Sequence, residues 1–326
     1  MTASVLERDD LTRLDSEMAC ALRKAGELDF GGRATHSIYE AREQGRIACR
    51  YWAKGAPKAD EIVEASVPSL SRHIPLKLFL PRPGKPCPVV IFLHGGGWVM
   101  GTIEQDAYVQ GIFAKEHGLA VVSVDYRLAP ENPYPAALDD CKRVVRWIRE
   151  NGDRFGLDPS RIVLGGSSAG ANLAIATALS LRDERVDAVQ ALVLFCGVFY
   201  GKPDTDSYIE FADGRFGLSH ADMHNFYDLY LSHPALLSDP YVSPALAELS
   251  GLPPIWLGAA GLDVVRDDSI TLAARLNDAG VVNRLVVYPG LTHGFTSRAR
   301  VVSKARESIR EAAAYIEDVL LTLNKI

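Results

Sequence analysis

The sequence predicts an α/β fold with a mostly parallel central sheet, helices on both faces of the sheet and a helical cap. Three observations lead to this prediction. From residue 88 onward, short apolar runs rich in branched side chains alternate with amphipathic stretches, which is typical of βα units. Two further apolar runs precede this alternation. Residues 1–45 and 199–244 lie outside the alternation, which indicates that they form the cap.

Each element is assigned in chain order from the length and spacing of its apolar residues. The runs of strand length are residues 61–67, 74–80, 89–93, 120–124, 161–164, 191–195, 255–258 and 284–288. Apolar residues at helical spacing occupy residues 136–150, 172–181, 269–279 and 301–323. We expect the first two strands to form an antiparallel pair, followed by a largely parallel series.

The core and the cap differ in their sequence pattern. Residues 46–198 and 245–326 contain all of the predicted strands and are predicted to form the core of the fold. Residues 1–45 are helix-like and polar, whereas residues 199–244 are dense in aromatic side chains. These aromatic side chains suit a lid over an apolar pocket, or equally the insertion's own core. We expect an N-terminal cap segment and a cap insertion.

Composition and charge exclude several classes of protein. The 326 residues are 48% hydrophobic and 23% charged, as in ordinary globular proteins. A net charge of −6 disfavours a nucleic-acid partner. No apolar run approaches the ~20 residues of a membrane span, and the first residues lack the basic start of a signal peptide, so we expect a cytoplasmic location. The five cysteines form no CxxC pair and are predicted to be reduced.

The strongest chemical signal is Gly-Ser-Ser-Ala-Gly at residues 166–170, a G-x-S-x-G pentapeptide between a predicted strand and a predicted helix. In that context Ser168 lies on a tight turn, with its hydroxyl exposed at the carboxyl edge of the sheet. The alternatives are a helix cap or a phosphate loop, but the sequence contains neither the GK[ST] nor the G-x-G-x-x-G that a phosphate loop needs. Ser168 is therefore predicted to be a nucleophile.

A serine nucleophile needs a histidine to remove its proton. Of the eight histidines, His293 follows the predicted strand at residues 284–288 and can reach the carboxyl edge of the sheet. Taken alone, His293 would be interpreted as a surface-loop histidine. Combined with the serine motif, it is predicted to be the general base.

The histidine in turn needs a carboxylate to orient it. Asp263 follows the predicted strand at residues 255–258, at the same edge of the sheet. Asp267 and Asp268 are rivals, but they lie where the next helix begins and where acidic residues commonly complement the helix dipole. Asp239 lies in the predicted cap and is a weaker candidate.

His-Gly-Gly-Gly-Trp at residues 94–98 directly follows the predicted strand at residues 89–93. Three glycines let backbone N–H groups approach an oxyanion without side-chain obstruction. A flexible turn is the alternative, but the position before the serine motif favours an oxyanion loop. Trp98 and Met100 follow as candidates for the substrate pocket, or equally for the core.

These motifs resemble those of the hormone-sensitive lipase family of α/β-hydrolases, particularly its bacterial acetyl esterase branch, from about residue 88 to the C-terminus. Four more motifs carry the resemblance: Val-Asp-Tyr-Arg-Leu-Ala-Pro-Glu at 124–131, Tyr-Pro-Ala-Ala-Leu-Asp-Asp at 134–140, Gly-Leu-Asp-Val-Val-Arg-Asp-Asp at 261–268 and His-Gly-Phe at 293–295. The chain order of Ser168, Asp263 and His293 is also that of α/β-hydrolases.

The resemblance implies an α/β-hydrolase fold and a catalytic triad of the three residues just named. The implied oxyanion donors are the backbone N–H groups of Gly96, Gly97 and Ala169, with Gly95 as an alternative. His94 and the segment around Asp125 would brace the oxyanion loop. Such a mechanism needs no metal and no cofactor, and its substrate is a small ester.

Some positions depart from the family's pattern. Ser167 stands where the family usually has an acidic residue, and Ala171 stands where it usually has glycine. The family's Asp-Pro-Leu-Arg-Asp is Asp-Val-Val-Arg-Asp at residues 263–267. No catalytic group is lost, so the reaction class stands, but the subfamily and the substrate are less defined.

The sequence therefore predicts a serine carboxylesterase that hydrolyses short-chain, acetyl-like esters through an acyl-enzyme intermediate. The alternatives are a lyase such as a dehydratase and a non-catalytic small-molecule receptor, because the same scaffold supports both. The retained Ser168 and His293 argue against a receptor. The oligomeric state is not predicted.

Overall fold

The computed structural model describes residues 8–28, 37–69, 72–81, 84 and 86–323. Parts of the predicted N-terminal cap segment, residues 1–7 and 29–36, lie outside the described residues. The strands are β1 (Glu61–Pro68), β2 (His73–Leu80), β3 (Cys87–Leu93), β4 (Ala120–Val124), β5 (Leu157–Ser167), β6 (Val189–Phe195), β7 (Ile255–Leu262) and β8 (Asn283–Thr292).

The α-helices of the described chain are α1 (Arg8–Arg13), α2 (Ser16–Glu27), α3 (Ile38–Trp52), α4 (Ala107–His117), α5 (Ala136–Asn151), α6 (Ala169–Asp183), α7 (Asp206–Glu210), α8 (His220–Tyr230), α9 (Arg266–Asp278) and α10 (Ser303–Leu323). The short 3₁₀ helices are η1 (Gly152–Phe155), η2 (Pro234–Ser238), η3 (Pro244–Leu246) and η4 (Phe295–Arg298). Within the described residues, no helix is both long enough and apolar enough to cross a membrane.

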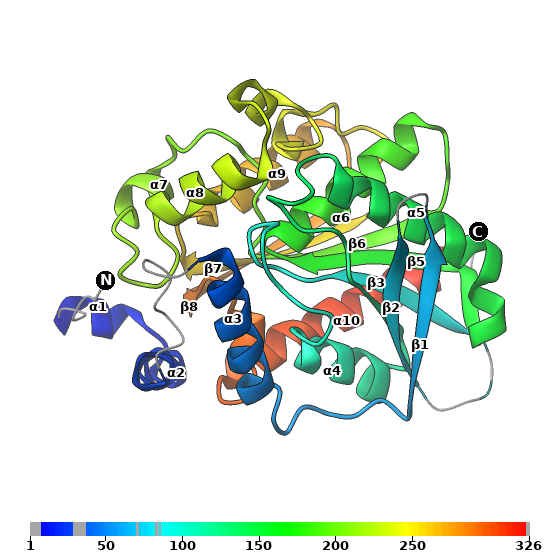
Figure 1. Ribbon diagram of the computed structural model, residues 1–326, viewed down its shortest axis with the longest axis horizontal. Helices are drawn as coiled ribbons and strands as arrows, with labels where there is room; N and C mark the ends of the chain where they lie inside the picture. The colour runs from blue at the N-terminus through cyan, green and yellow to red at the C-terminus, as the bar shows by residue number, and fades with distance from the viewer. Residues whose placement is uncertain (1–7, 29–36, 70–71, 82–83, 85, 324–326) are drawn as a thin grey trace.

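The described strands form one eight-stranded sheet in the order β1-β2-β4-β3-β5-β6-β7-β8. Strand β2 is antiparallel to β1 and β4, and all other neighbours are parallel. Helices α4 and α10 cover one face, while α5, α6 and α9 cover the other (Figure 1). The predicted α/β-hydrolase fold is therefore confirmed, including its antiparallel pair.

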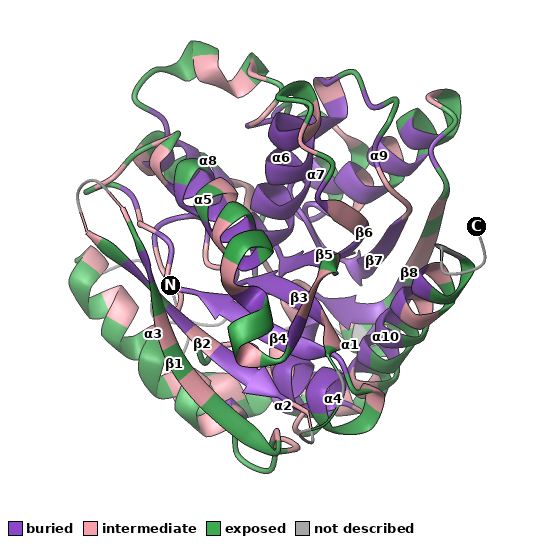
Figure 2. Cartoon of the chain, turned by 90° about the vertical axis from the view of Figure 1, so that its right-hand side faces the viewer, coloured by how far each residue is buried: buried purple, intermediate pink, exposed green. Residues whose placement is uncertain are grey.

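The central strands are apolar because helices cover both of their faces. Strands β3 and β4 have the sequences CPVVIFL and AVVSV and lie in the buried interior (Figure 2). Strand β1 at the edge alternates between exposed and more buried residues. Helix α5 buries one face, which carries Leu138, Cys141, Val144, Val145 and Ile148 at helical spacing.

Several predicted elements are longer in the structure than in the sequence pattern. Strand β5 begins at Leu157, because this residue pairs with Cys87 of β3, although most of the residues between Leu157 and Ile162 are polar and lie in a register shift. Strand β8 continues to Thr292 for the same reason, through pairing with β7. The predicted boundary at residue 45 falls inside α3, which continues to Trp52. The division into core and cap otherwise remains a prediction.

The strand order places two loops side by side. Strand β3 lies between β4 and β5. After β3 the chain therefore forms the neighbouring strand on one edge of β3, and then forms β5 on its other edge. Leu93 at the end of β3 pairs with Gly166 near the end of β5. The loops that follow these two strands therefore start at the same level, in the crevice where ligands bind in open α/β sheets.

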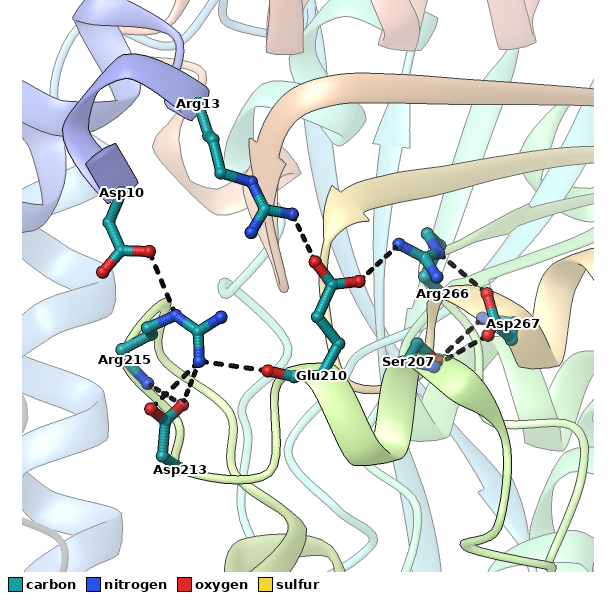
Figure 3. Close-up of polar contacts among 8 residues, drawn as sticks. All are labelled: Asp10, Arg13, Ser207, Glu210, Asp213, Arg215, Arg266 and Asp267. Atoms are coloured by element: carbon teal, nitrogen blue, oxygen red, sulfur yellow. Dashed lines mark hydrogen bonds and ion pairs between the residues drawn. The ribbon is translucent and has the colours of Figure 1, made fainter.

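An ionic network joins the N-terminal helix α1, the cap insertion and α9 (Figure 3). Glu210 at the end of α7 contacts Arg13 of α1 at 2.6 Å and Arg266 of α9 at 3.4 Å. Arg215 of the cap insertion contacts Asp10 of α1 at 3.1 Å. Two cap segments that are about 200 residues apart in sequence are thus held together by charge.

Replacing Glu210 by glutamine is expected to lower the free energy of unfolding by about 0.5–1 kcal/mol, because both ion pairs are partly exposed. The loss should shrink in 1 M salt, which screens such pairs. Thermal unfolding at low and high salt measures both effects. Glu27→Gln, which removes an ion pair with Lys24 inside the single helix α2, is the control. An equal loss in both variants would contradict a role in joining the cap.

Candidate active site

Ser168 lies at the junction of β5 and α6 in a strained backbone conformation. Its φ is 57°, a value that non-glycine residues rarely adopt. Its N–H donates a hydrogen bond to the Phe195 carbonyl at 2.9 Å. A Cβ at Gly170 would lie 1.9 Å from the Leu93 carbonyl oxygen, and a Cβ at Gly166 would lie 2.3 Å from the Gly170 carbonyl carbon. The two glycines therefore allow helix α6 to pack closely behind the serine.

Replacing Gly170 by alanine is expected to lower the free energy of unfolding by about 1–3 kcal/mol, because backbone must move to make room for the methyl group. Chemical denaturation measures the loss. Gly26→Ala is the control: that position in α2 has open space around it, so the variant should gain about 0.5–1 kcal/mol. A Gly170→Ala protein as stable as the wild type would contradict the close packing.

The pairing of β7 and β8 brings the other two predicted triad residues together. Leu262, the last residue of β7, pairs with Thr292, the last residue of β8. Asp263 and His293 are the residues that directly follow these two. The Nδ1 atom of His293 lies 2.7 Å from Asp263 Oδ2. Its Nε2 atom lies 2.8 Å from Ser168 Oγ. The three side chains, predicted from separate parts of the sequence, thus form one continuous hydrogen-bonded chain.

The two candidate acids Asp263 and Asp267 have different partners. The side chain of Asp263 is fully buried, and its Oδ1 accepts a hydrogen bond from the Val265 N–H at 3.2 Å. Asp267 instead accepts a hydrogen bond from the Ser207 N–H at 2.8 Å and pairs with Arg266. Asp267 therefore belongs to the cap network of Figure 3. Among the two, Asp263 alone is bonded to the histidine.

Asp268, the third candidate acid, lies in the interior. Its Oδ2 accepts hydrogen bonds from the N–H groups of Phe199 and Tyr200, at the start of the cap insertion. Burial raises the pKa of Asp268 to about 8, although these two hydrogen bonds act in the opposite direction. In the unfolded chain an aspartate ionises near pH ~4. Between these values the folded state retains a proton that the unfolded state has lost.

The titration of Asp268 should consequently lower the free energy of unfolding as the pH rises from about 4 to 8. Replacing Asp268 by asparagine keeps an oxygen acceptor for both N–H groups but removes the titration. Between pH 5 and pH 8, the wild type is expected to lose about 2–4 kcal/mol of unfolding free energy relative to this variant. Denaturant titrations at both pH values measure the difference. Parallel pH profiles of the two proteins would contradict the assignment.

The glycine loop after β3 faces the serine. Gly96 and Gly97 have φ values of 120° and 59°, which favour glycine. A Cβ at Gly97 would lie 2.4 Å from the Phe226 ring, so helix α8 of the cap insertion packs directly on this loop. Ala169 begins α6, where a backbone N–H has no partner within the helix. These positions suit the predicted oxyanion donors.

His94 and Tyr126 support the glycine loop from behind. Their rings stack with centroids 4.2 Å apart, and the Tyr126 hydroxyl donates a hydrogen bond to the His94 carbonyl at 2.7 Å. The Nδ1 atom of His94 lies 2.9 Å from the Gly95 carbonyl oxygen. Burial lowers the pKa of His94, which favours the neutral ring. These contacts agree with the bracing role that the resemblance implies.

Arg42 of α3 is a second support, which the sequence pattern did not indicate. Its guanidinium donates hydrogen bonds to the carbonyls of Val99 and Ala129, both at 2.8 Å, and pairs with Glu131 at 2.7 Å. The N-terminal cap segment therefore holds the far end of the glycine loop.

A cavity of about 200 Å³ lies against Ser168 and His293. Met100 lines it, as the sequence suggests. Trp98 does not: its side chain is fully buried and stacks on Tyr230, with centroids 4.5 Å apart, so the core interpretation holds. The rest of the wall comes mainly from four places: α3 (Arg42, Cys49, Trp52), the segment before α4 (Thr102, Gln105, Asp106), the cap insertion (Leu218, Phe226) and η4 (Thr296, Ser297, Arg298).

The fold and the site together define an α/β-hydrolase. The model of the α/β-hydrolase fold family matches residues 90–297, and the chain belongs to this family, in the hormone-sensitive lipase group that its motifs predict. Within the described residues, no three His, Cys, Asp or Glu side chains are grouped to hold a metal ion.

Known proteins similar to this chain are esterases. The chain is 36% identical over 254 residues to carboxylesterase NlhH of Mycobacterium tuberculosis, covering 76% of this chain and 79% of that protein. The solved esterase of Pyrobaculum calidifontis superposes with a TM-score of 0.88 at 32% identity, covering 94% and 99% of the two chains. An ester-hydrolase from the Lake Arreo metagenome, complexed with a bipyridine phosphonate derivative, gives a TM-score of 0.86 at 31% identity, covering 93% and 98%. This protein is a carboxylic ester hydrolase.

Proposed function

We propose that the enzyme hydrolyses short-chain esters of small molecules through an acyl-enzyme intermediate on Ser168. The observation that carries this proposal is the chain of contacts from Ser168 Oγ to His293 Nε2 at 2.8 Å and from His293 Nδ1 to Asp263 Oδ2 at 2.7 Å. A nucleophile, a base and an orienting acid in this arrangement are what serine acyl transfer requires.

In the first half of the reaction, the Asp263 carboxylate accepts the Nδ1–H of His293, which leaves Nε2 free to take the Ser168 proton. The serine oxygen attacks the ester carbonyl carbon, and the carbonyl oxygen becomes an oxyanion. The N–H groups of Gly96, Gly97 and Ala169 are assigned to stabilise it. Each such donor contributes about 10²- to 10³-fold in rate where it has been measured in other enzymes.

Collapse of the tetrahedral intermediate completes the transfer. The bond between the carbonyl carbon and the alcohol oxygen breaks, and His293 gives its proton to the departing alcohol. A water molecule then attacks the acyl-enzyme while His293 takes a proton from it. The carboxylic acid leaves, and Ser168 regains its hydrogen. Asp263 stays ionised throughout and stabilises the imidazolium.

The size of the cavity supports the preference for short chains. Its volume of about 200 Å³ is smaller than the roughly 300–1,000 Å³ typical of pockets for larger ligands. Phe226 and Leu218 of the cap insertion form part of its wall. A long acyl chain would need these side chains to move.

Two measurements test the proposed function. A phosphonate ester should label the enzyme once, with the adduct on Ser168 by mass spectrometry. In a series of p-nitrophenyl esters, kcat/KM should be highest at two to four acyl carbons. Labelling elsewhere, or none, would refute the serine mechanism and favour a receptor. Ester consumption that does not yield the hydrolysis products, carboxylic acid and p-nitrophenol, would point to a lyase. A maximum at long chains would refute the short-chain preference.

A further inference from the structure

Three residues on the wall of the catalytic cavity each carry a buried polar atom that has no hydrogen-bond partner among the described residues. These atoms are the indole Nε1 of Trp52, the carboxylate Oδ2 of Asp106 and the hydroxyl Oγ1 of Thr296. The three residues are only 3%, 4% and 2% exposed. Buried polar groups are nearly always hydrogen-bonded, so three unpaired ones beside a single cavity need an explanation.

The elements that carry these three residues pack against one another. Trp52 ends α3, Asp106 directly precedes α4, and Thr296 lies on η4. Helix η4 packs against both α3 and α4. Cys49, one turn before Trp52, is close enough to Asp106 that the carboxylate adds to the effect of burial, which raises the pKa of the thiol to about 11. Thr296 lies three residues after the catalytic His293.

The usual structural roles do not account for the Asp106 carboxylate. An aspartate before a helix normally accepts a hydrogen bond from a backbone N–H of the first turn. Asp106 makes no such bond with α4. Burial alone raises the pKa of Asp106 to about 7, so no nearby cation offsets the burial of its charge. Its Oδ2 therefore has no partner among the described residues.

The three groups differ in hydrogen-bonding capacity. The Trp52 indole can only donate, the Asp106 carboxylate accepts, and the Thr296 hydroxyl does both. A ligand hydroxyl both donates and accepts, so it can pair with each of them. An apolar chain would leave all three unpaired.

We propose that Trp52, Asp106 and Thr296 form a polar subsite that binds a hydroxyl group of the substrate. The preferred substrates of the enzyme are then short esters that carry a hydroxyl on the acid or on the alcohol. This inference rests on the proposed function, because the subsite and the Ser168–His293 pair line the same cavity.

Matched pairs of esters test the subsite in the wild-type enzyme. One pair is p-nitrophenyl butyrate and p-nitrophenyl 3-hydroxybutyrate, and the other is propyl acetate and 3-hydroxypropyl acetate. We expect kcat/KM to favour the hydroxylated ester by about tenfold or more in at least one pair, as sites built to hydrogen-bond a hydroxyl do. No preference in either pair would overturn the proposal and leave the three groups to bound water.

Variants identify the residues responsible. Trp52→Phe, Thr296→Val and Asp106→Leu each remove one polar group, and each should lower the ratio of the two kcat/KM values by about tenfold. The ratio is used because a general loss of activity cancels in it. Trp256→Phe is the matched control, since its indole nitrogen on β7 is also buried and unpaired but lies outside the cavity wall. A ratio unchanged in all three subsite variants would overturn the proposal.

The experiments distinguish a failure of the subsite proposal from a failure of the proposed reaction mechanism. If Ser168→Ala still hydrolyses the unsubstituted esters at the wild-type rate, the mechanism is wrong whatever the ratios are. If hydrolysis depends on Ser168 but the ratios do not depend on the three residues, only the subsite is wrong. Asp106→Leu replaces an unpaired buried carboxylate by an apolar side chain of similar size, so its thermal midpoint should not fall below that of the wild type.

Discussion

Replacing Ser168 by alanine is expected to lower kcat for p-nitrophenyl acetate by about 10⁶-fold, the size of effect seen when a triad serine is removed. In the proposed mechanism the hydroxyl oxygen, 2.8 Å from His293 Nε2, attacks the ester, and alanine has no atom in its place. The oxyanion donors stay, so some catalysis over water should remain. Steady-state kinetics on the purified variant, with circular dichroism to confirm folding, give the result.

The neighbouring serine is the matched control for this loss. Ser167 also carries a buried hydroxyl, but its partner is the Cys196 thiol at 3.7 Å and not the histidine. Ser167→Ala should keep activity within about tenfold of the wild type, because it removes no reacting atom. A Ser168→Ala enzyme with near wild-type activity would eliminate Ser168 as the nucleophile.

Replacing Asp263 by asparagine is expected to lower kcat by on the order of 10⁴-fold. The asparagine side chain fits the same space, but its NH₂ group can donate to His293 Nδ1. In the wild type this nitrogen lies 2.7 Å from Asp263 Oδ2. The ring would then carry its hydrogen on Nε2, where it cannot accept the serine proton. Kinetics with p-nitrophenyl acetate measure the loss.

Asp267→Asn separates the two acids. Asp267 contacts Ser207 and Arg266 in the cap network, so its amide variant should change stability more than turnover. If Asp267→Asn proved to be the more damaging change for kcat, the assignment of Asp263 as the orienting acid would be wrong.

The sheet was predictable because its central strands must be apolar on both faces. Runs such as residues 89–93 and 120–124 can be recognised locally, since no other short element buries every side chain. The serine, acid and histidine were also predictable, because each follows a predicted strand within a few residues and parallel strands end at one edge of the sheet. Short-range pattern and topology together were enough to bring three distant residues together.

The walls of the cavity were not predictable in the same way. Arg42, Cys49 and Trp52 lie on a helix with an ordinary amphipathic pattern, and the face that it turns toward the site depends on docking against distant elements. Trp98 shows the opposite case: it is adjacent in sequence to the glycine loop, yet its positive φ of 61° accompanies a side chain that packs into the core. Position along the chain does not decide on which side of a loop a residue lies.

The hydrogen bonds that Arg42 donates to the carbonyls of Val99 and Ala129 have a practical consequence. A chain trimmed at its N-terminus to the start of the sheet would still contain every reacting group. It would nevertheless lose the guanidinium that anchors the glycine loop, and we expect its turnover to fall as a result. Any shortened form of the protein should therefore keep helix α3, because this helix supports the proposed oxyanion loop from outside the sheet.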